Sequence, residues 1–94
     1  MTGIMLVKQQ VADVEQWNRV FCDPALDAIR RQHGLVVTGT YVDDTDPNTV
    51  IVVMDMENID KAKRFAASPE LAAARERAGA VGSPDGVWFG PHHV

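Results

Sequence analysis

Residues 58–87 read NIDKAKRFAASPELAAARERAGAVGSPDGV, and this alanine-rich stretch decides the fold. Asn58 is a good helix N-cap. The Ser68-Pro69 pair marks a second helix start, because serine caps well and proline fits the first helical position. Gly79 is placed to end the second helix in a left-handed cap. The stretch therefore predicts a kinked helical segment, whose many alanines indicate close packing against the surface that it covers.

A similar helical region is predicted upstream of this stretch. Asp13 can cap its start, and apolar side chains then recur at helical spacing. The Asp23-Pro24 pair interrupts the pattern, so the helix either kinks there or restarts and runs to about Gln32. Gly34 is a good stop. The face expected to be buried carries Val14, Trp17, Val20, Phe21, Leu26 and Ile29.

Four short segments of the chain are predicted to be β-strands. They are residues 4–8, 35–42, 50–56 and 87–89. Turn-forming residues at 43–48 are expected to join two antiparallel strands. The order β-α-β-β-α-β gives an α+β fold class: one ferredoxin-like domain over residues 1–94, with a four-stranded antiparallel sheet and helices on one face.

The other face of this sheet is also expected to be apolar. Residues 4–8 and 50–56 carry apolar side chains on both sides, yet the helices can cover only one. The uncovered face would then expose more apolar surface than the few hundred Å² that monomers usually tolerate. The simplest cover is a second copy related by a twofold axis. We therefore expect a homodimer whose sheets pack face to face.

Composition and charge exclude several classes of partner. The net charge is −4 with a pI near 5.1, and the basic residues are dispersed, which disfavours nucleic acid and anionic membranes. Cys22 is the single cysteine, so no internal disulfide can form, in agreement with a reducing compartment. The apolar runs are far shorter than the roughly 20 residues of a spanning helix. A signal peptide is also absent, so a soluble cytoplasmic protein is expected.

Three groups of residues resemble one superfamily over nearly the whole chain. They are Val11-x-Asp13-x-x-x-Trp17-x-x-x-Phe21, Asp44-x-Asp46-Pro47-Asn48, and Phe65-Ala66-Ala67-Ser68-Pro69-Glu70-Leu71 with Ala78-Gly79-x-x-Gly82-x-Pro84. The chain resembles the dimeric α/β barrel proteins, which include antibiotic-biosynthesis monooxygenases, small polyketide cyclases and haem-degrading monooxygenases. Within them it is most similar to small cyclase-like or monooxygenase-like proteins. These motifs are caps, turns and helix–sheet contacts, which identify fold better than chemistry.

The same resemblance bears on cofactors. Haem-degrading members hold iron with a histidine of the second helical region, and residues 58–79 contain no histidine. The sequence also lacks a phosphate loop, a nucleophile elbow and a dinucleotide fingerprint. We therefore expect no haem and no other cofactor.

Aromatic side chains are the candidates for substrate binding, because the helices and the sheet of this fold enclose a space between them. Trp17 and Tyr41 each carry a polar group that would orient an aromatic ligand. Ordinary core packing is the alternative for Phe21 and Phe65. The full candidate set is Trp17, Phe21, Tyr41, Phe65 and Trp88.

Histidine is the natural residue for acid–base work near neutral pH, and the chain has three. His33 is the catalytic candidate, although a place at the end of a helix also suits simple contact with the last carbonyls. His92 and His93 are adjacent in the tail and have no third ligand at a recognisable spacing, so we expect no metal site. Their role is left open.

Two functions from different classes follow from these observations. The first is a cofactor-independent monooxygenase or cyclase that acts on an aromatic or polyketide-like substrate. The second is a non-catalytic homodimer, either a ligand carrier or a structural protein, because no tight acid–base pair is apparent. A pocket of several hundred Å³ with convergent polar groups would favour ligand chemistry. Alanine-lined contact without a void would favour the structural role.

Overall fold

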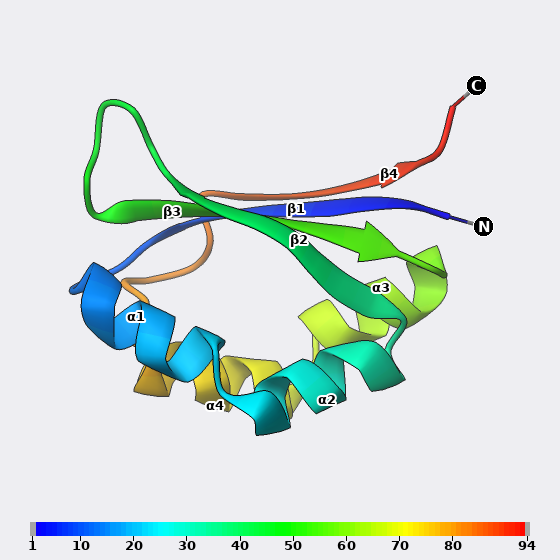
Figure 1. Cartoon of the computed structure of the whole chain (residues 1–94), viewed down its shortest axis with the longest axis horizontal. Helices are drawn as coiled ribbons and strands as arrows, with labels where there is room; N and C mark the ends of the chain where they lie inside the picture. Colours follow the sequence, from blue (N-terminus) through cyan, green and yellow to red (C-terminus); the bar gives the residue numbers. More distant parts are fainter. Residues whose placement is uncertain (1, 94) are drawn as a thin grey trace.

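The computed structural model describes residues 2–93 as one antiparallel sheet with helices on a single face (Figure 1). The strands are β1 (Gly3–Gln10), β2 (Leu35–Val42), β3 (Thr49–Met56) and β4 (Gly86–Pro91). The helices are α1 (Val14–Phe21), α2 (Pro24–Gln32), α3 (Ile59–Ala66) and α4 (Pro69–Arg77). The strand order is β2-β3-β1-β4, and every pair is antiparallel. The expected ferredoxin-like α+β fold is confirmed.

Each predicted helical region consists of two separate helices. Pro24 and Pro69 start α2 and α4, because a proline at the first helical position lacks only an N–H that the helix does not use. The Asp23 carboxylate accepts a hydrogen bond from the Ala25 N–H at 2.9 Å, and the Ser68 hydroxyl caps α4 in the same way. In both helical regions, the second helix therefore starts at an N-cap residue followed by proline.

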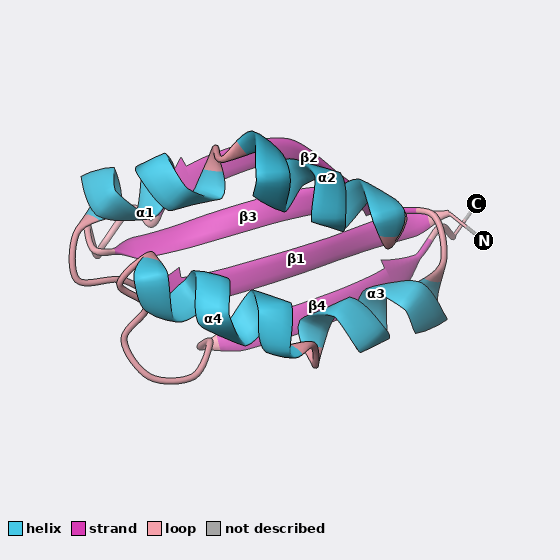
Figure 2. Ribbon diagram, turned by 90° about the horizontal axis from the view of Figure 1, so that it is seen from below, coloured by secondary structure: helices cyan, strands magenta, loops and turns pink. Residues whose placement is uncertain are grey.

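The helices form two rows beneath the sheet. Seen from the helical side, α1 and α2 lie over β2 and β3, while α4 and α3 lie over β1 and β4 (Figure 2). No helix within residues 2–93 is long and apolar enough to cross a membrane. The core lies between the sheet and these two rows of helices.

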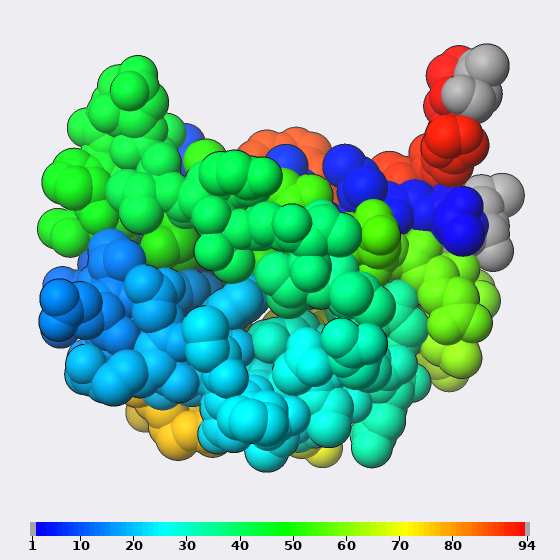
Figure 3. Space-filling view, viewed as in Figure 1, coloured from blue at the N-terminus to red at the C-terminus, as the bar shows by residue number. Residues whose placement is uncertain are grey.

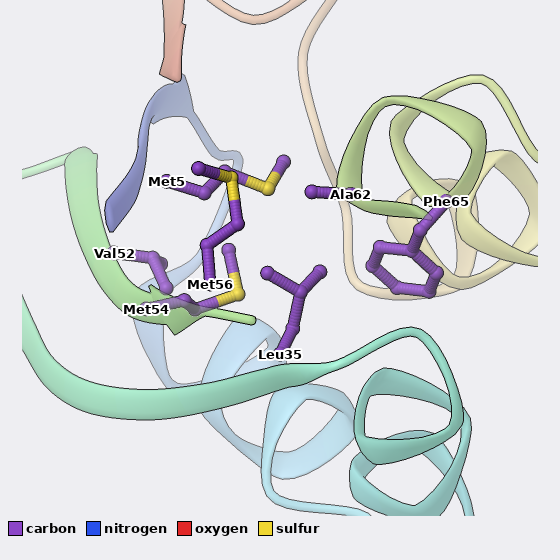
Figure 4. Close-up of a cluster of buried hydrophobic side chains, with 7 residues drawn as sticks. All are labelled: Met5, Leu35, Val52, Met54, Met56, Ala62 and Phe65. Carbon is purple, nitrogen blue, oxygen red and sulfur yellow. The ribbon is translucent and has the colours of Figure 1, made fainter. Parts of the chain in front are cut away.

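The main core cluster joins the middle of the sheet to α3. Phe65 is 2% exposed, and Ala62 is fully buried beside it. Methionines from β1 and β3 and Leu35 from β2 meet them from the sheet (Figure 4). The cluster consists of Met5, Leu35, Val52, Met54, Met56, Ala62 and Phe65. A smaller cluster at the other end contains Val11, Trp17, Val50 and Ala78.

The sheet face away from the helices, called the open face below, is apolar at its centre, as the strand patterns indicate. The strand register places on it Ile4, Leu6, Val36, Tyr41, Ile51, Val53 and Trp88. The Tyr41 ring lies over Gly39, and the Trp88 ring lies over Gly86. The β2–β3 loop and the C-terminal end of the chain rise on either side of this face, so it is concave in profile (Figure 3).

Candidate functional site

A cavity of about 270 Å³ lies between the helices and the sheet. Its walls are almost entirely apolar. On the helical side they include three small residues, Ala66, Ala74 and Ala78. The close packing predicted from the alanine content is therefore wrong here, because these short side chains stand beside larger ones and leave space. The other lining residues are Met5, Val7, Trp17, Val20, Phe21, Leu26, Arg30, Val52, Met54, Phe65, Leu71, Arg75, Pro84 and Val87.

Three of the five predicted aromatic residues line this cavity. Trp17 and Phe21, one helical turn apart on α1, have ring centroids 6.1 Å apart and nearly parallel rings. Phe65 reaches the cavity from α3. These rings also belong to the core or pack against it, so they satisfy both the binding and the core interpretation of the sequence.

Arg30 is the most buried charged residue in the cavity wall, with only 5% of its surface exposed. Its guanidinium lies over the Phe21 ring, with Cζ 4.4 Å from the ring centroid. One Nη2 hydrogen bond, of 3.0 Å, goes to the Phe21 carbonyl. The Nε atom is buried and has no hydrogen-bond partner. Burial lowers the pKa of Arg30, because desolvation disfavours the charged form.

Arg75 reaches the cavity from α4 and is held by two strong acceptors. Its Nη2 atom donates to Gln9 Oε1 at 2.6 Å and to the Gly82 carbonyl at 2.9 Å. Gln9 is fully buried and in turn donates from Nε2 to the Val81 carbonyl. This network ties β1, α4 and the connector before β4 together. Arg75 therefore has a clear structural role at the cavity wall.

Sequence reasoning missed both arginines, although the chain carries a signal for them. α2 begins Pro24-x-Leu26-x-x-x-Arg30, and α4 begins Pro69-x-Leu71-x-x-x-Arg75. In each helix the arginine follows an inward-facing leucine by four residues, so the two side chains share one helix face. An arginine on the apolar stripe of an amphipathic helix is the pattern that would have identified both residues.

Tyr41 does not join the other predicted binding residues. The register shifts between Val37 and Gly39, where a β-bulge interrupts the β2–β3 pairing. The extra residue reverses the alternation of side chains, so Tyr41 pairs with Ile51 on the open face and is 59% exposed. The prediction that places Tyr41 in the pocket is wrong for this reason.

Trp88 is also outside the cavity. Its strand neighbours Val87 and Phe89 point toward the helices, so Trp88 points away, opposite Leu6 of β1. The side chain is 54% exposed on the open face. The predicted convergence of five aromatic rings is therefore limited to three.

His33 lies at the C-terminal end of α2 and does not line the cavity. Its Nδ1 atom is 2.9 Å from the Ile29 carbonyl, so a protonated Nδ1 donates to one of the last carbonyls of the helix. The ring packs against Phe65 at 5.1 Å between centroids. This geometry is that of the simple helix-end contact.

The tail histidines lie elsewhere. His92 borders a broad, open depression at one end of the sheet, together with Arg31, Asp55 and Glu57. His93 is exposed. Among residues 2–93, no cluster of three His, Cys, Asp or Glu side chains could hold a metal ion.

No protein-family model matches the sequence, and no curated protein matches it. Solved structures do match the fold. A candidate antibiotic biosynthesis monooxygenase from Caulobacter crescentus CB15 has a TM-score of 0.68 at 17% identity, over 94% of this chain and 86% of that chain. Another candidate antibiotic biosynthesis monooxygenase, from Chloroflexus aurantiacus J-10-fl, has a TM-score of 0.60 at 12% identity, over 100% of this chain and 96% of that chain.

A third structure, described as an antibiotic biosynthesis monooxygenase, has a TM-score of 0.55 at 15% identity, over 93% of this chain and 95% of that chain. At these identities the likeness concerns the fold. The chain thus has the βααββααβ ferredoxin-like fold of the antibiotic biosynthesis monooxygenase structures.

Proposed function

We propose that this protein binds a small aromatic or polyketide-like molecule in the cavity between the helices and the sheet. The observation that carries the proposal is the cavity itself: about 270 Å³ of space, walled by aromatic, methionine and aliphatic side chains. Ligand sites are concave and mostly apolar, with a few polar groups that fix orientation. This volume lies just below the usual range of about 300–1,000 Å³, so the best ligand has about one ring.

Cofactor-independent oxygenation or cyclisation of that ligand is the activity that the similar structures suggest. All three are described as antibiotic biosynthesis monooxygenases, two of them as candidates. A carrier without catalysis is the second candidate. It is supported by the wall chemistry, since Arg30 and Arg75 are the only ionisable side chains among residues 2–93 that line the cavity. An arginine binds and orients anions but exchanges protons poorly near neutral pH.

Binding can be tested with methionine methyl groups as reporters. Met5 and Met54 line the cavity, whereas Met56 belongs to the core but not to the lining. In protein with ¹³C-methyl methionine, p-cresol is expected to shift the Met5 and Met54 signals, and to shift Met56 much less. The Ala74→Leu variant, which fills part of the cavity, is expected to lose this response. Equal shifts in both proteins, or none in either, would overturn the proposal.

We also propose that a second copy of the chain covers the open face. The support is the row of apolar side chains on this face, of which Ile4 is 45% exposed and Trp88 is 54% exposed. The Tyr41 and Trp88 rings occupy the space beside Gly39 and Gly86 and add aromatic surface to this face. Light scattering at micromolar concentration is expected to give twice the 10.3 kDa chain mass. A monomeric mass would contradict this assembly.

A cytoplasmic location is the remaining part of the proposal. Cys22 is exposed and unpaired, a state that reducing compartments maintain. Cell fractionation with detection of the tagged chain is expected to recover it with cytoplasmic markers, and recovery in another fraction would refute the assignment.

A further inference from the structure

The cavity contains a positive charge that the protein itself only partly compensates. The Arg30 side chain is 6% exposed, and its carboxylate neighbour Asp27 lies 3.7 Å from Nη2. Asp27 forms a shorter contact, of 2.8 Å, with the exposed Arg31. A buried charge or N–H group without a partner costs free energy that a ligand can recover. The Nε of Arg30, like that of Arg75, is buried without a hydrogen-bond partner, so a ligand that reached it would supply the missing acceptor.

The geometry around Arg30 favours a flat anion. The guanidinium is held against the Phe21 ring, and an arginine fixed in this way presents its donors in one plane. A carboxylate accepts two parallel hydrogen bonds from such a fork. The remaining wall is apolar and suits an aromatic ring beside the carboxylate.

Arg30 also lies close to solvent on its outer side. It borders a second hollow between the α1–α2 junction and β2, where Pro24 and Thr38 contribute to the rim (Figure 3). Arg30 and Phe21 line both hollows and therefore separate the inner cavity from this surface hollow. A charge at this position can meet an anionic ligand before the apolar part of the ligand is buried.

Both cavity arginines have a buried Nε without a partner, and they differ in the hydrogen bonds that Nη2 already makes. Arg75 already gives Nη2 to Gln9 and to the Gly82 carbonyl, and these bonds hold the wall in place. Arg30 has one backbone acceptor and a long ion pair. We propose that the ligand is a small aromatic carboxylate and that Arg30 determines this specificity by binding the carboxylate; this inference rests on the proposed function of the cavity.

Two probes of equal size test the inference. Phenylacetate carries the carboxylate, and phenylacetamide replaces it with a neutral amide. Titrations of both are followed through the Met5 and Met54 methyl signals. Wild type is expected to bind phenylacetate at least tenfold more tightly than phenylacetamide. In Arg30→Met the phenylacetate affinity is expected to fall roughly 10- to 100-fold, as loss of a charge-assisted hydrogen bond predicts, while phenylacetamide changes less than threefold.

Arg31→Met is the matched control, because it makes the same change one residue later on α2, where the side chain is 60% exposed. It is expected to leave both affinities unchanged. Arg30→Lys keeps the charge without the planar fork and is expected to bind phenylacetate with intermediate affinity. This variant also keeps the test decisive if Arg30→Met fails to fold.

The outcomes separate the inference from the function on which it rests. Equal wild-type affinity for the two probes, or an equal loss in Arg30→Met and Arg31→Met, overturns the role of Arg30 and leaves the cavity a binding site for neutral aromatics. Loss of phenylacetate binding in Arg75→Met alone also overturns it. If neither these probes nor p-cresol move the cavity methyl signals, the proposed function fails as well.

Discussion

Filling the cavity should stabilise the protein while removing its ligand site. Ala74 is 3% exposed on α4 and lines the cavity, so in Ala74→Leu three added carbon atoms enter space that is already present. At about 0.8 kcal/mol for each buried CH₂, the full gain is about 2.4 kcal/mol. The loss of leucine side-chain freedom on folding reduces this gain by about 0.5–1 kcal/mol. The expected net stabilisation is therefore about 1.5 kcal/mol.

Thermal unfolding followed by circular dichroism measures this gain. For a domain of this size, about 1.5 kcal/mol corresponds to a Tm increase of roughly 6–12 °C, at a fixed protein concentration. Ala73→Leu is the matched control, because it makes the same change on the neighbouring, exposed position of α4. It is expected to change stability by less than about 0.5 kcal/mol. A lower Tm for Ala74→Leu with an unchanged Ala73→Leu would show that no such space exists.

Three further predictions concern other parts of the molecule. Val53→Glu puts a charge on the open face and is expected to give a monomer by light scattering, whereas Val42→Glu, on the opposite face of the sheet, should remain dimeric. His33→Ala should lower stability by about 1 kcal/mol in denaturant unfolding through loss of the helix-end hydrogen bond, with p-cresol affinity unchanged. Hydrogen bonds from the Thr49 hydroxyl and the Asn48 N–H hold the pKa of Asp46 below 3.8, so its stabilising effect is present above pH 3.8 and lost as the pH falls through the depressed pKa. The Tm difference between wild type and Asp46→Asn should therefore shrink with acidification, and a constant difference would refute this.

Local signals predict most of the fold. Asn58 accepts hydrogen bonds from the N–H groups of two first-turn residues, as its N-cap position suggests. Gly34 and Gly79 end their helices with positive φ angles of 71° and 82°. Caps, prolines and glycines act within one helical turn, so the sequence alone is enough to locate them.

The candidate site is less predictable because it depends on register and on distant neighbours. The bulge in β2 lies beside Gly39, and a glycine inside a strand can mark a bulge without showing that the alternation of side chains reverses after it. This reversal moves Tyr41 to the other face. An arginine such as Arg30 is normally expected to face solvent. Its spacing of four residues from Leu26 instead places it on the buried face of α2. The cavity volume depends on how Ala66 and Ala74 stand beside Phe65, which no single segment specifies.

The placement of the two tryptophans gives the protein a built-in pair of optical probes. Trp17 is 7% exposed beside the cavity, and Trp88 is 54% exposed on the opposite side of the sheet. Their fluorescence should therefore separate into a blue-shifted component and a red-shifted one that acrylamide quenches. A ligand in the cavity would change the Trp17 component, and a partner on the open face would protect the Trp88 component from quenching. Fluorescence therefore reports ligand binding and coverage of the open face separately.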